Sequence, residues 1–145
     1  MVIREMTAED VPEVHRIEEE CFSQPWSEKA FYEELENPYG RTLVAVLESK
    51  AAGFINVRSI GGEIYINNIA VSGDFRRKGV GDGLLSALEK AFEAYEFITL
   101  EVRESNIPAI RLYEKHGFRQ VGKRKNFYEK PTEDAILMTK DRKDA

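Results

Sequence analysis

Cysteine is nearly absent from this 145-residue chain, and long apolar segments are missing altogether. The single cysteine, Cys21, cannot form a disulfide within the chain or a cysteine-based zinc cluster. No apolar run is long enough to cross a membrane, and the N-terminus lacks the charged and apolar regions of a signal peptide. The only histidines, His15 and His116, do not have the spacing of metal ligands. We therefore expect a cytoplasmic protein that binds no metal and makes no use of a membrane.

Basic residues are outnumbered by acidic ones. The chain has 21 lysines and arginines against 26 aspartates and glutamates, a net charge of −5. This balance argues against direct nucleic-acid binding, which relies on a broad basic surface, and at long range it favours a basic peptide partner. Internal repeats, low-complexity tracts and Pro/Ser-rich linkers are absent too. The length suffices for one core, so we expect a single domain over residues 1–145.

Hydrophobic periodicity predicts an α/β chain in which short strands and amphipathic helices alternate. Thr7 and Ser27 are expected to cap the first two helices, with Asp10 closing a capping box after Thr7 and Leu35 on the apolar face of the second helix. Asn106 or Ser105 is expected to cap the last helix. The predicted strands cover residues 2–6, 43–47, 53–57, 64–71, 97–102, 118–121 and 135–139. The predicted helices follow Thr7, Ser27, the turn at 76–81 and Asn106, the last of them ending at about residue 116.

The strand over residues 64–71 changes phase. Ile64 and Ile66 share one parity, whereas Ile69 and Val71 share the other. A period of two that shifts within a strand indicates a β-bulge, here at Asn67-Asn68. A strand buried on both faces would explain the same pattern equally well.

A basic, glycine-rich turn follows that strand. Residues 76–81 read Arg-Arg-Lys-Gly-Val-Gly and lead into an amphipathic helix. Unpaired N–H groups and the positive end of a helix dipole suit a bound phosphate. The glycines at 79, 81 and 83 fit neither the Walker A loop nor the dinucleotide fingerprint. On spacing alone, an ordinary basic turn is as good an explanation.

The turn matches Arg/Gln-x-x-Gly-x-Gly/Ala, the acetyl-CoA motif of the GCN5-related N-acetyltransferase (GNAT) superfamily. Within it the chain resembles the RimI-like enzymes, which acetylate the N-terminus of a ribosomal protein. The stretches that carry this likeness are Pro25-Trp26-Ser27, Asn68-Ile69-Ala70-Val71, Leu100-Glu101-Val102-Arg103 with Ser105-Asn106, Leu112-Tyr113-Glu114 with Gly117-Phe118, and, more loosely, Arg124-Lys125-Asn126-Phe127-Tyr128 with Glu133-Asp134-Ala135. The resemblance implies the GNAT fold, a mixed, mostly antiparallel sheet flanked by helices, with a splayed central strand pair.

The resemblance further implies direct transfer from acetyl-CoA to a protein N-terminal α-amine. It favours the bulge, because in this superfamily a bulge here opens a slot whose strand edge pairs with the pantetheine arm. The expected cofactor-binding residues are Ile69, Ala70, Val71, Arg76, Arg77, Lys78, Gly79, Val80, Gly81, Asp82 and Asn106. Asp82 departs from the basic or neutral residue that is frequent in the family, and an anion there weakens a phosphate site unless it points away.

Two residues are expected to handle protons. Glu101 matches the RimI-like catalytic glutamate, and a carboxylate acting through water can deprotonate a terminal amine, whose pKa is about 8. From the residues alone, a salt bridge with Arg103 or an exposed place on an edge strand is the more ordinary interpretation. Tyr113 matches the tyrosine that protonates the departing thiolate in the superfamily, although its helical stripe equally suits a core tyrosine. A backbone N–H near Val71 is expected to polarise the thioester carbonyl.

Three aromatic residues, Phe22, Trp26 and Tyr128, are expected to contact the acceptor, although packing would explain each of them as well. Tyr128 is expected on the loop between the last two strands, where Lys-Asn-Phe-Tyr-Glu-Lys-Pro replaces the usual Arg-Asn-Tyr-Tyr-Pro. This departure bears on the acceptor's identity, for which the resemblance suggests a small-subunit ribosomal protein. A small-molecule amine, a lysine side chain or a non-catalytic CoA-binding role stays open, as does partnership with tRNA-modification proteins. Cys21 and both histidines are expected to be structural.

Overall fold

A mixed sheet forms the centre of the computed structural model, which describes residues 1–144. Its seven strands lie in the order β1-β2-β3-β4-β5-β7-β6. The strands are β1 (Val2–Glu5), β2 (Gly40–Leu47), β3 (Lys50–Ile60), β4 (Glu63–Val71), β5 (Phe97–Arg103), β6 (Arg119–Tyr128) and β7 (Glu133–Asp141). The helices are α1 (Val11–Cys21), α2 (Glu28–Glu36), α3 (Val80–Ala91) and α4 (Ile107–Lys115), with 3-10 turns at Ala8–Asp10, Gly73–Phe75 and Arg142–Asp144. The expected sequence of strands and helices is confirmed.

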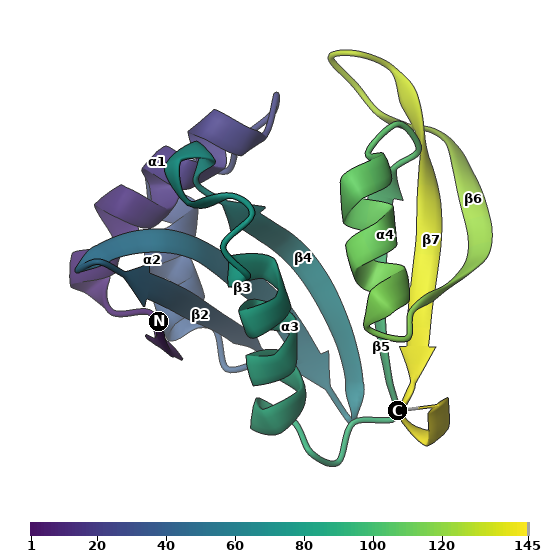
Figure 1. Cartoon of the computed structure of the whole chain (residues 1–145), viewed down its shortest axis with the longest axis horizontal. Coiled ribbons are helices and arrows are strands. Elements are labelled where there is room, and N and C mark those ends of the chain that lie inside the picture. Colours follow the sequence, from purple (N-terminus) through teal and green to yellow (C-terminus); the bar gives the residue numbers. More distant parts are fainter. Residues whose placement is uncertain (145) are drawn as a thin grey trace.

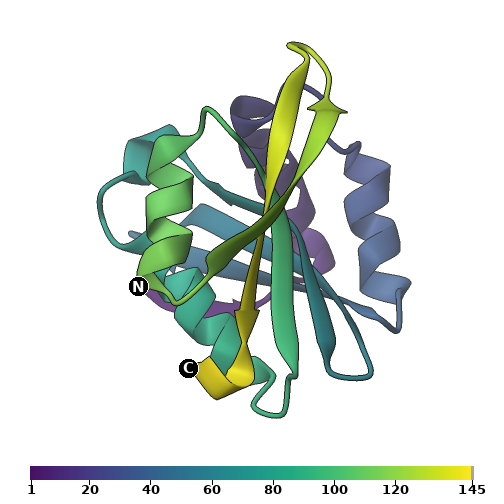
Figure 2. The same cartoon turned by 90° about the vertical axis from the view of Figure 1, so that its right-hand side faces the viewer.

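Helices cover both faces of the sheet (Figure 2). Buried side chains form two clusters, one on each face. The cluster under α3 and α4 includes Leu84, Leu88, Ile98, Leu100, Val102 and Ile110. The cluster under α1 and α2 includes Val11, Val14, Ile17, Phe31, Phe54 and Ala70. None of the helices described in residues 1–144 is long and apolar enough to span a bilayer.

The helix starts follow the predicted capping chemistry with two corrections. Ser27 Oγ accepts a hydrogen bond from Ala30 N at 3.1 Å, as expected for an N-cap. Asp10 accepts from Thr7 N at 2.7 Å, but this capping box closes the 3-10 turn Ala8–Asp10 that precedes α1 rather than α1 itself. Leu35 is 41% exposed, so the second helix buries a narrower face than its sequence suggested.

The central strands β4 and β5 separate along their length (Figure 1). They pair in parallel only from Glu63↔Phe97 to Tyr65↔Thr99. Beyond that point the described partners are β3 for β4 and β7 for β5. The register between β3 and β4 shifts after Asn56↔Asn68, which leaves Asn67 as an extra residue on β4. The bulge and the splayed strand pair are therefore confirmed, because the extra residue bends β4 away from β5.

The bulge also reverses which side chains of β4 face each helix layer. Ile64 and Ile66 are in the cluster under α3 and α4, against which Ile69 also packs. After the extra residue Ala70 is in the cluster under α1 and α2, and Asn68 contacts α1. A strand buried uniformly on both faces is thus the wrong interpretation of the phase change.

Candidate active site

Two cavities on opposite faces of the sheet meet in the gap between β4 and β5. The first, of about 560 Å³, lies beneath the α1–α2 loop and the β6–β7 turn, and we call it the loop-side cavity. The second, of about 660 Å³, lies beside α3 and α4, and we call it the helix-side cavity. Their shared lining consists of Cys21, Phe22, Ile69, Asn106, Ala109 and Tyr113. Two ligands can therefore enter from opposite faces and touch between the strands.

The basic turn forms one end of the helix-side cavity. Gly79 has φ +77° and is the N-cap of α3, so the turn enters the helix through a left-handed residue. Arg76, Arg77 and residues 79–82 line the cavity beside the open N–H groups of the first helical turn. Lys78 is not part of that lining, since its Nζ lies 5.5 Å from the Phe75 ring centroid and 4.0 Å from the Glu48 carboxylate.

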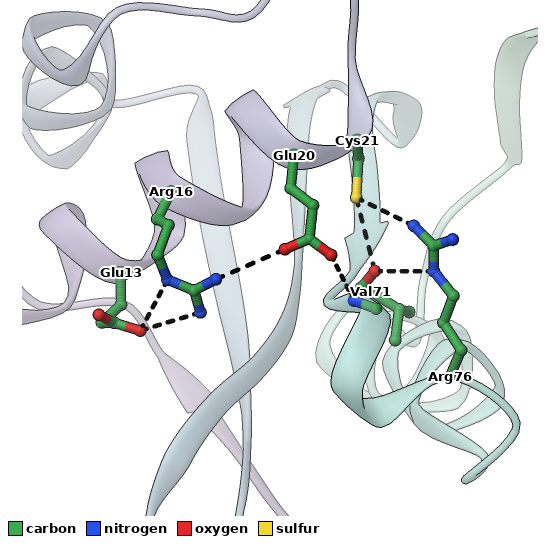
Figure 3. Close-up of polar contacts among 7 residues, drawn as sticks. Glu13, Arg16, Glu20, Cys21, Val71 and Arg76 are labelled. Atoms are coloured by element: carbon green, nitrogen blue, oxygen red, sulfur yellow. Dashed lines mark hydrogen bonds and ion pairs between the residues drawn. The ribbon is translucent and has the colours of Figure 1, made fainter.

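The exposed edge of β4 points into the gap at Val71. Ser72 N donates to Ala52 O of β3, so the next residue back, Val71, faces the other way. Its carbonyl accepts from Cys21 Sγ at 3.5 Å and from Arg76 Nε at 3.4 Å (Figure 3). Because N–H and C=O of one strand residue point to the same side, Val71 N–H is directed into the gap as well.

Cys21 lies at the wall common to both cavities rather than in the core. It is half-buried, and Arg76 Nη2 approaches its sulfur at 3.7 Å (Figure 3). Burial raises the pKa of the Cys21 thiol, which keeps the group protonated. One residue earlier, Glu20 accepts from Gly73 N at 2.5 Å. These contacts fasten the end of α1 to the β4–α3 connection.

Asp82 turns toward α4 although it also lines the helix-side cavity. Its Oδ1 lies 2.9 Å from His116 Nε2 and 3.0 Å from Lys115 Nζ. The hydrogen bonds from His116 and Lys115 lower the pKa of Asp82. Two partners thus screen the anion that the sequence places beside the phosphate turn, and His116 links α3 to α4.

The Gly79 turn supplies a test of the helix-side cavity. A Gly79→Ala variant should bind acetyl-CoA about tenfold more weakly, equivalent to about 1.4 kcal/mol, because a side chain disfavours the left-handed conformation that orders the turn. Steric contact will not obscure the result, since no atom lies within 4 Å of the ideal Cβ position. Calorimetric titration with acetyl-CoA measures the affinity. A Gly61→Ala variant is the matched control, because Gly61 has φ +56° and open surroundings but lines neither cavity.

Glu101 lines the loop-side cavity from the middle of β5. Its side chain is 30% exposed, and strand alternation directs it away from Leu100 and Val102, which pack under α4. Its cationic partner is Arg124 on β6, whose Nε lies 3.3 Å from Oε1. Neither alternative weighed from the sequence occurs, because the partner is not Arg103 and β5 is not an edge strand.

Tyr113 and Tyr128 flank the gap. Tyr113 is 5% exposed and belongs to the wall common to both cavities, where burial raises the pKa of its hydroxyl. Tyr128 lines the loop-side cavity, and burial together with the Glu101 carboxylate raises the pKa of Tyr128 to about 12. Tyr128 ends strand β6 and pairs with Glu133, so its expected place on a loop is wrong. This pairing could not be predicted from the sequence, because the strand register shifts between Arg124 and Tyr128.

Glu18 is a polar residue of this site that the sequence analysis missed. It is 1% exposed on α1 and lines the loop-side cavity. Its carboxylate accepts from Asn68 Nδ2 at 2.8 Å and from Trp26 N at 2.9 Å. Burial raises the pKa of Glu18. A signal was present, because Glu18 lies seven residues after Val11 and so shares its buried helix face.

The aromatic residues of the α1–α2 loop line the loop-side cavity. Trp26 lines the loop-side cavity and packs against Phe31 in a tilted arrangement with ring centroids 5.4 Å apart. Phe22 lines both cavities and is 36% exposed. The structure therefore brings Phe22, Trp26 and Tyr128 together around one cavity, with Glu101 inside it.

Comparison with known proteins identifies the family. Residues 11–118 match the family model described as "Acetyltransferase (GNAT) family". The chain belongs to the GNAT acetyltransferase family. Its resemblance to the RimI-like branch is confirmed by curated relatives. A Bacillus subtilis protein, provisionally named a [ribosomal protein bS18]-alanine N-acetyltransferase, is 39% identical over 94% of this chain and 92% of its own length. The Escherichia coli [ribosomal protein bS18]-alanine N-acetyltransferase is 37% identical over 94% of each chain.

Solved structures of GNAT proteins superpose on this one. The crystal structure of the Escherichia coli ribosomal-protein-S18-alanine N-acetyltransferase has a TM-score of 0.89 at 33% identity, covering 97% of this chain and 92% of that one. Arabidopsis thaliana NAA60 in complex with acetyl-CoA has a TM-score of 0.85 at 19% identity, covering 97% of each chain, and shares the fold. The predicted GNAT fold is thus confirmed.

The helix-side cavity of this GNAT chain fits acetyl-CoA. The Val71 N–H, two arginines and the open N–H groups after Gly79 follow one another along its wall. Asn106 lines both cavities and caps α4, its Oδ1 accepting from Ala109 N at 3.3 Å. The cap is confirmed, whereas contact between Asn106 and the cofactor stays a prediction.

Proposed function

We propose that this chain transfers the acetyl group of acetyl-CoA directly to the N-terminal α-amine of a protein, with a ribosomal protein of the bS18 type as its acceptor. The observation that carries the proposal is the meeting of two cavities between Glu101 and Tyr113, which stand on opposite faces of the sheet. The RimI-like relatives, which are named [ribosomal protein bS18]-alanine N-acetyltransferases, suggest the acceptor class.

The helix-side residues hold the donor. Arg76, Arg77 and the N–H groups after Gly79 bind the pyrophosphate, and the free edge of residues 69–71 pairs with the pantetheine arm as an added strand would. When bound, acetyl-CoA supplies a thioester, whose acyl carbon accepts an amine. Val71 N–H, directed into the gap, donates to the carbonyl oxygen on which negative charge develops.

Proton transfers divide between the two faces. On the loop side, Glu101 takes a proton from the α-ammonium through water, so that the amine lone pair can form the new C–N bond. On the helix side, Tyr113 O–H gives a proton to the sulfur as the C–S bond breaks, and the second proton that the nitrogen loses on becoming an amide passes through water and restores the Tyr113 hydroxyl. Burial raises the pKa of Tyr113, so its hydroxyl holds the proton until the thiolate leaves.

An α-amine suits this arrangement better than a lysine side chain. A terminal amine has a pKa of about 8, against about 10.4 for lysine, so one carboxylate suffices as its base. Three acidic residues, Glu18, Glu101 and Glu133, line the loop-side cavity. Two basic ones, Arg103 and Lys130, line it as well, and this balance favours a cationic chain end. Phe22, Trp26 and Tyr128 supply the apolar walls that hold the first residue.

A peptide panel tests the proposal. The purified chain is incubated with acetyl-CoA and peptides that begin with free Ala, Ser or Met, and thiol release and peptide mass are followed. N-terminally blocked peptides containing lysine, and spermidine, are the matched controls. Acetylation confined to free N-termini, with Ala preferred, is expected. Modification of only the blocked peptides or only spermidine would show that the acceptor is a lysine side chain or a small amine rather than an N-terminus. Binding of acetyl-CoA without any turnover would favour a regulatory role.

A further inference from the structure

Arg103 is a basic residue of the loop-side cavity that the proposed chemistry does not use. It ends β5, two residues after Glu101 and on the same face of the sheet. Its guanidinium is 24% exposed and donates four hydrogen bonds. Nη1 contacts Pro131 O and Glu133 Oε1, each at 3.0 Å, and Nη2 contacts Glu129 O at 2.8 Å and Ser23 Oγ at 3.3 Å.

These four partners come from two separate segments. Glu129, Pro131 and Glu133 belong to the β6–β7 turn and the start of β7, whereas Ser23 belongs to the α1–α2 loop. The two segments form the two rims of the loop-side cavity. In sequence they are about a hundred residues apart, and a single side chain joins them.

The guanidinium also fixes an aromatic wall of the cavity. Its Cζ lies 4.6 Å from the ring centroid of Tyr128. Arginine can stack on a ring and donate from several N–H groups at once because its fork is planar and rigid, which lysine cannot reproduce. The other oxygen of Glu133 accepts from Ser105 N at 2.6 Å, so the same network reaches the start of α4.

We propose that Arg103 is a positioning residue that sets acceptor affinity by holding both rims of the loop-side cavity at a fixed spacing. This inference rests on the proposed function, because it assigns that cavity to the acceptor. None of the residues that Arg103 contacts lines the helix-side cavity. Loss of the guanidinium therefore affects the acceptor and spares acetyl-CoA.

Steady-state kinetics of an Arg103→Ala variant tests this assignment. The KM for the acceptor peptide should rise about tenfold or more, equivalent to at least about 1.4 kcal/mol. The KM for acetyl-CoA and kcat at saturating peptide should stay within about twofold, since a mobile rim weakens binding more than it alters the reacting groups. Arg103→Lys should not restore the acceptor KM. Arg119→Ala is the matched control, because Arg119 pairs with Asp141 and lines neither cavity.

Fluorescence of Trp26 tests the tether without any acceptor. Trp26 is the single tryptophan of the chain and lies on the loop that Arg103 holds through Ser23. Acrylamide quenching of Trp26 should increase in Arg103→Ala and, by a smaller amount, in Ser23→Ala, but not in Arg119→Ala. Ser23→Ala removes one hydroxyl from an exposed loop, so it carries the test if Arg103→Ala does not fold.

The two measurements distinguish failure of the positioning role from failure of the proposed function. A wild-type chain that turns over no free N-terminus overturns the proposed function, and quenching then still decides whether Arg103 holds the loop. Quenching of Arg103→Ala and Ser23→Ala equal to that of the wild type overturns the positioning role. A KM for acetyl-CoA that rises as much as the KM for the peptide overturns it too.

Discussion

Replacing Glu101 by glutamine should lower kcat by about 10²- to 10⁴-fold, the range that a positioned general base contributes. The substitution keeps the size of the side chain and an oxygen that can still accept from Arg124, so the strand and its ion-pair partner stay in place. The negative charge and the ability to accept a proton are lost. Turnover of a free-Ala peptide, followed by thiol release, measures the effect, and acetyl-CoA affinity should be unchanged.

The pH dependence of this variant distinguishes a base from a packing residue. The acceptor amine has a pKa of about 8, so at higher pH it loses its proton to water without help. The deficit of Glu101→Gln should therefore narrow as the pH rises toward about 9. Glu104→Gln is the matched control, since Glu104 also pairs with a β6 cation, Lys123 at 2.7 Å, but lines neither cavity. Equal activity of the two variants would remove Glu101 from the mechanism.

Replacing Tyr113 by phenylalanine should lower kcat by about 10²-fold, the lower end of the general-acid range. The ring that packs 5.8 Å from Phe118 is retained, so the fold and acetyl-CoA affinity should be preserved. Loss of the Tyr113 hydroxyl slows the reaction only when the leaving thiolate must be protonated as it departs. An aryl thioester, whose thiolate departs unprotonated, should therefore restore much of the lost rate.

Tyr95→Phe is the matched control for Tyr113. Tyr95 is 5% exposed, lines neither cavity, and its hydroxyl has no hydrogen-bond partner among the described residues. Its removal should leave turnover unchanged, with stability equal or higher by about 1 kcal/mol, because an unsatisfied buried hydroxyl is costly. A parallel loss of acetyl-CoA binding and turnover in Tyr113→Phe would instead indicate that the hydroxyl holds the cavity together.

Local patterns in the sequence were enough to predict the order of elements, whereas the splayed strands were predicted only with the help of the family resemblance. The phase change at Asn67-Asn68 is a local signal, and the register confirms it as a bulge. The cap at Ser27 is likewise a local feature, because its partner Ala30 lies three residues away. Such features depend on backbone geometry and nearest neighbours, which a single sequence contains.

Long-range partners could not be predicted in the same way. Glu101 pairs with Arg124, which reaches it across β7 and becomes a neighbour only when the sheet assembles. The contact of Arg103 with Ser23 joins positions that no periodicity relates. Tyr128 was misplaced because a register shift interrupts β6, and Glu18 was missed because a charged residue on a core stripe looks like a solvated one. Each of these errors concerns tertiary contact rather than local propensity.

The short ladder between β4 and β5 gives the sheet an unusual mechanical character. In residues 1–144, the pairs from Glu63↔Phe97 to Tyr65↔Thr99 are the whole of that ladder. The sheet therefore consists of two parts joined by this short ladder, the first made of β1 to β4 and the second of β5 to β7 (Figure 1). A strand-like ligand in the opening supplies the pairing that the two parts lack. If acetyl-CoA is that ligand, as proposed above, its binding should make the sheet stiffer.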